Sequence, residues 1–118
     1  MTELHINDKL TEIPTYAFAY TNIKNLHIPE NITSIDACAF INTDIETVTF
    51  SEGLTFIGTR AFSGNDKLQK IIIPTTVRTI SERAFSRCHD LKYVYIPKSV
   101  YHVGRRCFVR SKDLTIDC

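Results

Sequence analysis

Short runs in which apolar and polar residues alternate recur along the whole chain. Each run places two apolar residues two positions apart, which is the pattern of a strand with one buried face. The pairs are Leu4/Ile6, Leu26/Ile28, Val48/Phe50, Ile71/Ile73, Val94/Ile96 and Leu114/Ile116. In four copies a turn residue follows the run at once: Asn7, Pro29, Pro74 and Pro97. Since proline cannot donate to a strand ladder, it marks a strand end. The pattern therefore predicts six short strands.

A repeated Ala-Phe dipeptide lies between these runs. It occurs at 17–18, 39–40, 61–62 and 84–85, and Cys107-Phe108 takes its place in a fifth copy. The phenylalanines are 22, 22, 23 and 23 residues apart, because the first two copies lack one residue between the phenylalanine and the next aliphatic residue. A period of this length with several aliphatic positions per copy is typical of a solenoid.

The repeat predicts one domain over residues 1–118, built from about five coils. The short strands of successive coils are expected to pair in parallel, about 4.8 Å apart, and to form a concave sheet. Turns and short helical or 3₁₀ segments are expected on the other side. In the fourth copy the expected core residues are Val77, Ile80, Ala84, Phe85 and Leu91, and Cys107 is expected to replace the small buried alanine in the fifth.

The full motif, I-P-x-x-V-x-x-I-x-x-x-A-F-x-x-C-x-x-L-x-x-V-x-I-P, is present at every anchor of the fourth copy. It resembles the BspA-like leucine-rich repeat family, and the resemblance covers essentially the whole chain. It implies a curved solenoid with a parallel sheet on one face. It also implies protein–protein or adhesive binding, and many members of that family are secreted or attached to the cell surface.

The neighbouring residues Cys88, His89 and Asp90 spell the parts of a cysteine nucleophile, a base and an orienting carboxylate. In the register of the repeat, Cys88 aligns with Thr43, Asn65 and Ser111, at a corner where small polar side chains bond to turn backbone. His89 and Asp90 fall on solvent-facing turn positions. Catalysis also needs a nucleophile and a base that converge. We therefore predict a structural Cys88 and a chain that is not an enzyme.

The outward residues of the strands are expected to form a protein-binding face. Clustered aromatic and aliphatic side chains with basic neighbours are typical of recognition surfaces, and concave solenoid faces are their usual place. The alternative is cross-strand packing that merely shields the sheet. The predicted face consists of His5, His27, Thr49, Lys70, Ile72, Tyr93 and Tyr95, with Thr115 continuing the central column.

Two stacked histidines beside Glu3, namely His5 and His27, raise the question of a metal. Two imidazoles on an open surface fall short of a closed site, so no metal and no other cofactor is expected. The four cysteines include no Cys-x-x-Cys pair and are expected to be reduced thiols.

Charge is distributed unevenly along the chain. Residues 1–59 carry eight acidic and two basic residues, a net charge of −6, and residues 60–118 carry twelve basic and five acidic residues, a net charge of +7. An alternative function is therefore the binding of nucleic acid or an acidic partner by a basic patch. The patch consists of Arg60, Arg83, Arg87, Arg105, Arg106 and Arg110.

The partner expected first is another protein, bound by an inhibitor or adaptor that acts by occlusion. The two alternatives are the binding of nucleic acid or an acidic partner, and a surface or adhesion role. The start of the chain lacks a signal-peptide pattern and no apolar run is long enough to cross a bilayer, so a cytoplasmic location without membrane contact is expected. If a longer precursor exists, the expected location is secreted or at the cell surface. Neither end carries a separate polar cap, so self-association through the open solenoid ends is a further hypothesis.

Overall fold

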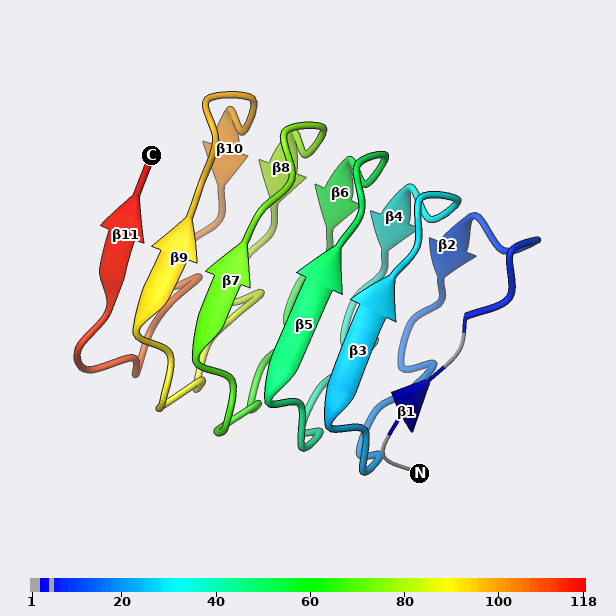
Figure 1. The fold of residues 1–118 in the computed structure, drawn as a ribbon. Coiled ribbons are helices and arrows are strands. Elements are labelled where there is room, and N and C mark those ends of the chain that lie inside the picture. The colour runs from blue at the N-terminus through cyan, green and yellow to red at the C-terminus, as the bar shows by residue number, and fades with distance from the viewer. Residues whose placement is uncertain (1–2, 5) are drawn as a thin grey trace.

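The computed structural model describes residues 3–4 and 6–118, and within them the chain winds as a stack of coils with its two ends at opposite ends of the stack (Figure 1). Each coil contributes one strand to the front of this view, and all of these except the two-residue β1 are longer than the strands behind them. These strands are β1 (Glu3–Leu4), β3 (Asn25–Ile28), β5 (Thr47–Phe50), β7 (Lys70–Ile72), β9 (Tyr93–Tyr95) and β11 (Thr115–Asp117). All the pairings among them are parallel, which confirms the predicted solenoid.

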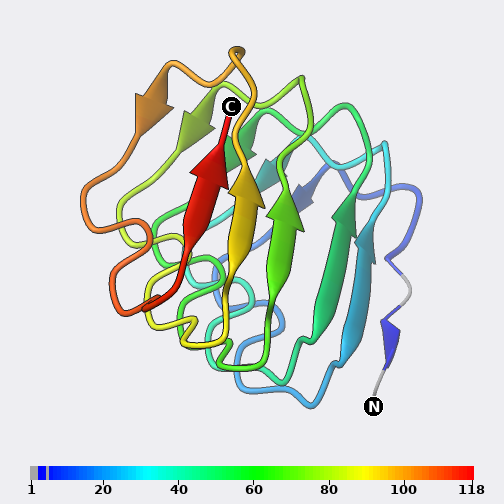
Figure 2. The same ribbon diagram turned by 60° about the vertical axis from the view of Figure 1, so that its left-hand side comes forward.

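A second parallel sheet lies behind the first and faces it across the core (Figure 2). Its strands have two residues each and pair in the order β10-β8-β6-β4-β2. They are β2 (Glu12–Ile13), β4 (Ser34–Ile35), β6 (Phe56–Ile57), β8 (Thr79–Ile80) and β10 (His102–Val103). The repeat motif contains these positions as the isoleucine four residues before each dipeptide alanine, and as Val103 before Cys107, but two residues are too short a run to show alternation.

The predicted helical or 3₁₀ segments are wrong for the described residues, where the corresponding stretches are successive turns. In the first full coil Tyr16, Phe18 and Tyr20 donate their N–H groups to carbonyls of the next coil, at 2.9–3.2 Å. The residues between them donate to carbonyls three positions earlier, as Ala17 does to Pro14. Every second N–H thus points along the stack, and a helix would direct all of them along its own axis.

A column of stacked phenylalanines fills the centre of the coils. Neighbouring ring centroids are 5.2–5.7 Å apart and the rings are inclined by 4–15°. The column runs through Phe18, Phe40, Phe62, Phe85 and Phe108. Three of the dipeptide alanines, Ala39, Ala61 and Ala84, and Cys107 are buried beside it, whereas Ala17 in the first coil is exposed. One continuous apolar core extends from Ile13 to Cys107.

The front sheet is interrupted between β5 and β7. Strands β1, β3 and β5 form one three-stranded sheet and β7, β9 and β11 form another. On either side the coils are joined by paired bonds, such as those from the N–H groups of Lys92 and Tyr93 to Gln69 O at 2.9 and 3.3 Å. Within the described residues no such ladder joins β5 to β7. This seam lies where the 22-residue coils give way to the first coil with the additional residue between Phe62 and Leu68.

The last strand differs from the expected register. Thr115 was predicted beside Tyr95, but it pairs with Tyr93, and Asp117 pairs with Tyr95. The reason is that Leu114 packs against the core as the counterpart of Leu91, which precedes β9, rather than as a residue within the strand. Leu114 and Ile116 fit either register by their apolar character alone. The backbone hydrogen bonds between β9 and β11 determine which register is adopted. No helix among the described residues is long and apolar enough to span a membrane.

Candidate functional site

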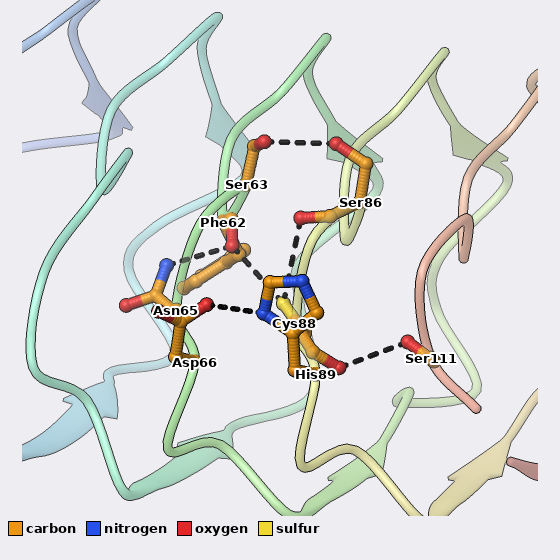
Figure 3. Close-up of polar contacts among 8 residues, drawn as sticks. All are labelled: Phe62, Ser63, Asn65, Asp66, Ser86, Cys88, His89 and Ser111. Atoms are coloured by element: carbon orange, nitrogen blue, oxygen red, sulfur yellow. Dashed lines mark hydrogen bonds and ion pairs between the residues drawn. The ribbon is translucent and has the colours of Figure 1, made fainter. Parts of the chain in front are cut away.

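Cys88 is one step of a polar ladder between the coils, as the register predicts (Figure 3). Its thiol is fully buried and donates to Phe62 O at 3.3 Å. Asn65, one coil earlier, donates from Nδ2 to the same carbonyl at 2.7 Å, and Ser111, one coil later, donates to Cys88 O at 2.9 Å. Burial raises the pKa of Cys88 to about 12, so the thiolate form that a nucleophile needs is strongly disfavoured.

His89 and Asp90 lie on exposed turns, also as predicted. The ring of His89 contacts a carboxylate, but of another coil: its Nδ1 lies 2.8 Å from Asp66 Oδ1 (Figure 3). The Cys88 thiol bonds instead to backbone. The Cys88 and His89 side chains therefore make separate contacts, Asp90 is exposed, and the three do not converge on one reacting atom.

Thiol labelling at pH 8 checks this assignment. Cys118 is exposed and should react rapidly with an aromatic disulfide reagent in the folded protein. Cys88 and Cys107, whose pKa values burial raises to about 12 and about 11, should react only as fast as the protein opens. A Cys118→Ser variant is the control and should lose the rapid phase. Rapid labelling of Cys88 in the folded protein, located by peptide mass mapping, would contradict the buried assignment.

The long-strand face, defined as the outward side chains of β3, β5, β7, β9 and β11, has its apolar centre at the seam. Ile72 is 46% exposed on β7. It lines a groove of about 420 Å³ together with Thr49 and Tyr95, and a second of about 470 Å³ together with Thr49 and Lys70. The structure thus brings four of the predicted face residues together around one interruption of the sheet.

Tyr93 is held on the same face by charged neighbours. Lys70 Nζ lies 6.0 Å from the centre of its ring, and its hydroxyl donates to Asp117 Oδ2 at 3.2 Å. Partial burial, followed by the Asp117 carboxylate, raises the pKa of Tyr93, so its phenol remains protonated and able to donate. The contact to Asp117 follows from the register of β11, which sequence reasoning placed differently.

His27 occupies the acidic half of the face and bonds to hydroxyls. Its Nδ1 lies 2.7 Å from Thr49 Oγ1 and its Nε2 lies 3.3 Å from Ser51 Oγ. His5 lies outside the described residues, so its stacking on His27 stays a prediction. Among the described residues, no three His, Cys, Asp or Glu side chains are grouped closely enough to hold a metal ion.

The basic patch forms a cleft on the turn side of the coils. Five of its six predicted residues line one open cleft of about 700 Å³: Arg60, Arg83, Arg87, Arg106 and Arg110. The sixth, Arg105, lies instead in a separate depression with Glu82 and His102. Sequence reasoning missed the other walls of this arginine cleft, which include Asn42, Ser63, Ser86 and Val109.

Each arginine of the cleft has a left-handed backbone, which sequence reasoning also missed. The φ angles are 56° at Arg60, 56° at Arg83, 59° at Arg87, 55° at Arg106 and 76° at Arg110. Asn42 and Gly64 hold the positions equivalent to Arg87 in earlier coils and are left-handed too, at 54° and 79°. Glycine and asparagine in one column of the repeat were a readable signal of this conformation.

Comparison with known proteins is consistent with this geometry. The family model described as BspA type leucine rich repeat region matches residues 1–115 in six copies. This chain belongs to that family. A search of curated proteins gave no match.

Solved BspA-type and other leucine-rich structures share this fold. A leucine-rich cell surface protein from Faecalibacterium prausnitzii is 27% identical, with a TM-score of 0.93 over 99% of this chain and 32% of its own. The pneumococcal vaccine antigen PcpA is 24% identical, with a TM-score of 0.74 over 98% and 38%. A leucine-rich repeat protein from Bacteroides ovatus is 19% identical, with a TM-score of 0.61 over 95% and 41%.

This chain therefore spans about a third of the length of the F. prausnitzii protein. The module is a leucine-rich repeat related to surface proteins. The cytoplasmic location expected from the sequence stays a prediction, whereas the similar F. prausnitzii protein is a protein of the cell surface.

Proposed function

We propose that this leucine-rich repeat module binds a partner protein through its long-strand face, centred on the seam between β5 and β7. The observation that carries the proposal is the exposure of Ile72, which is 46% accessible on a strand in the middle of the face. An isolated apolar residue on a surface needs no explanation, but this one stands between two grooves that Tyr95 and the stem of Lys70 help to line.

The backbone at the seam supports the same face. Where β5 and β7 lack a ladder, their facing N–H and C=O groups are not satisfied by each other. A partner segment that lies along the seam would cover Ile72, and the adjoining grooves would select its side chains.

Binding of this kind acts by occlusion, because the module covers a surface of its partner and carries out no reaction there. An inhibitor or an adaptor would use it in this way, and so would an adhesion module on a cell surface. The similarity to a cell surface protein favours the adhesive setting for the longer relative. The face and the partner class are the same in each case, so one experiment tests all of them.

The test compares two faces of the molecule. A protein captured from the native host with the wild-type chain is purified, and its dissociation constant is measured by calorimetry for Ile72→Ala, Tyr95→Ala and Phe56→Ala. Phe56 is the matched control, because it is 37% exposed on a strand of the opposite sheet. We expect about a tenfold or greater weakening for each of the first two variants and no change for the control.

Thermal unfolding of the same variants shows whether any loss comes from the fold. Exposed substitutions of this kind usually change stability little. Equal dissociation constants for all three variants and the wild type would refute the assignment of the face. A weakening by Phe56→Ala alone would move the site to the opposite sheet.

A further inference from the structure

The arginine cleft holds more positive charge than its surroundings balance. Four of its arginines are exposed and Arg83 is partly buried. Among the described residues, the ion pairs are Arg83–Glu82, with Nη1 and Oε2 3.5 Å apart, and His89–Asp66. Four of the five guanidinium groups of the cleft therefore have no carboxylate of the described residues within 4.0 Å. Like charges gathered on neighbouring coils repel one another unless an anion lies between them.

The backbone conformation of the cleft arginines is a second unusual feature of the site. Left-handed φ angles favour glycine and asparagine and disfavour long side chains. Two columns of turn positions, one from Tyr16 to Arg106 and one from Tyr20 to Arg110, have such an angle in all five coils, and arginine occupies five of these ten positions. These five belong to three successive coils and all line the same cleft. At these positions glycine or asparagine would fit the left-handed backbone better than arginine. Earlier coils have Asn42 and Gly64 at the position of Arg87.

The dimensions of the cleft limit what fits. Three stacked coils place the first and last arginines of a column about 10 Å apart, from a spacing of about 4.8 Å per coil. The volume of about 700 Å³ lies in the range of sites for small molecules. The floor includes the buried hydroxyls of Ser63 and Ser86, whose oxygens are 2.8 Å apart. The cleft therefore suits a compact ligand with several negative charges rather than a long duplex.

We propose that the arginine cleft binds a short chain of phosphate groups, in a site separate from the long-strand face. Guanidinium groups bind carboxylates and phosphates alike in a bidentate manner. A carboxylate carries one negative charge, whereas a terminal phosphate carries about 1.5 to 2 at neutral pH. Linked phosphates therefore neutralise five arginines within one small cleft with fewer groups than carboxylates would need. The phosphates come either from an inorganic oligophosphate or from a nucleoside triphosphate.

Titration calorimetry of the whole chain with inorganic tripolyphosphate tests the site. The variant Arg83→Asn/Arg87→Asn removes two arginines at the centre of the cleft and puts asparagine on a left-handed backbone. We expect it to weaken tripolyphosphate binding by about tenfold or more, since bonds between charged groups are the strong ones. Its midpoint of thermal unfolding should be unchanged or higher, because asparagine tolerates φ > 0.

Arg78→Asn is the control outside the cleft, because it removes a positive charge from an exposed arginine that is not among the residues that line the cleft. It should leave the affinity within about twofold. A second pair, Arg60→Asn/Arg106→Asn, repeats the test from the edges of the cleft, so that misfolding of one variant does not decide the result. No binding of tripolyphosphate, or equal losses in Arg78→Asn and both double variants, would overturn the proposal.

Competing ligands separate the sources and the other classes. Equal affinity for tripolyphosphate and a nucleoside triphosphate would assign recognition to the phosphates alone, and tighter binding of the nucleotide would make the nucleotide the ligand. Tighter binding of an oligoglutamate peptide than of either would overturn the proposal in favour of an acidic protein. Affinity that appears only with longer single-stranded oligonucleotides would overturn it in favour of nucleic acid.

Discussion

Replacing Phe62 with alanine is expected to lower the free energy of unfolding by about 3–5 kcal/mol. Its ring is fully buried and stacks between Phe40 and Phe85, at centroid distances of 5.2 and 5.3 Å. The ring of Phe50 meets it edge-on at 5.8 Å. The cost is large because the neighbouring coils are fixed by their own ladders and cannot close the cavity. Equilibrium unfolding in urea measures it.

Phe108→Ala is the matched control at the end of the same column. Phe108 stacks on Phe85 alone, at 5.7 Å, and is only partly buried. We expect it to cost about half as much as Phe62→Ala, since less apolar surface leaves contact. Equal losses at the two positions would show that the column is not the centre of stability. A loss at Phe62 below about 1 kcal/mol would show that the coils do collapse around the deleted ring.

Replacing Asn65 with leucine is expected to cost about 2–4 kcal/mol. The amide of Asn65 is fully buried, donates from Nδ2 to Phe40 O and Phe62 O at 2.9 and 2.7 Å, and accepts a hydrogen bond from the Thr43 hydroxyl. Leucine has nearly the same size but can make none of these bonds. The carbonyl of Phe40 would be left buried without a partner, Phe62 O would keep only the weak Cys88 thiol donor, and the Thr43 hydroxyl would lose its acceptor. Leaving such groups unsatisfied costs more than the bonds themselves contribute.

Cys88→Asn tests the same ladder in the opposite direction. Asparagine at this position can repeat what Asn65 does one coil earlier, with Phe62 O and Phe85 O as acceptors. We expect a change within about 1 kcal/mol, measured by the same urea unfolding, because a weak thiol donor is exchanged for a stronger amide donor. A loss as large as that of Asn65→Leu would show that the corner around Cys88 cannot accommodate the longer side chain.

The sequence predicted the solenoid well because its signals are local and repeated. Ala61-Phe62 and its counterparts fix the register of every coil, and each new copy confirms the last. Cys88 could be read correctly for the same reason, since its neighbours in the register, Asn65 and Ser111, reveal the role of the position. The same three letters, Cys-His-Asp, taken without the register would have indicated a catalytic site.

The turn segments and the site geometry were harder to predict. Nothing in the pattern around Ala17-Phe18 distinguishes a short helix from turns that donate every second N–H to the next coil. Asn42 and Gly64 signal the left-handed conformation in the column of Arg87, whereas Tyr16 and Cys38 give no such signal in the column of Arg60. The groove beside Ile72 depends on how a 22-residue coil stacks on a longer one, and the residue count shows the mismatch without showing where the ladder opens.

By itself, the sequence determined which residues are buried, which coil each belongs to and which side chains share a column. These properties follow from periodicity, because a solenoid repeats one local solution and each copy contacts only its neighbours. Only the tertiary structure decided where the front sheet is interrupted, that β11 pairs two residues away from the expected register, and that five of six patch arginines surround one cleft and Arg105 does not. Those outcomes depend on hydrogen bonds between the backbones of neighbouring coils and on backbone dihedral angles. Side-chain identity does not specify them, because several residue types tolerate the same position of the repeat.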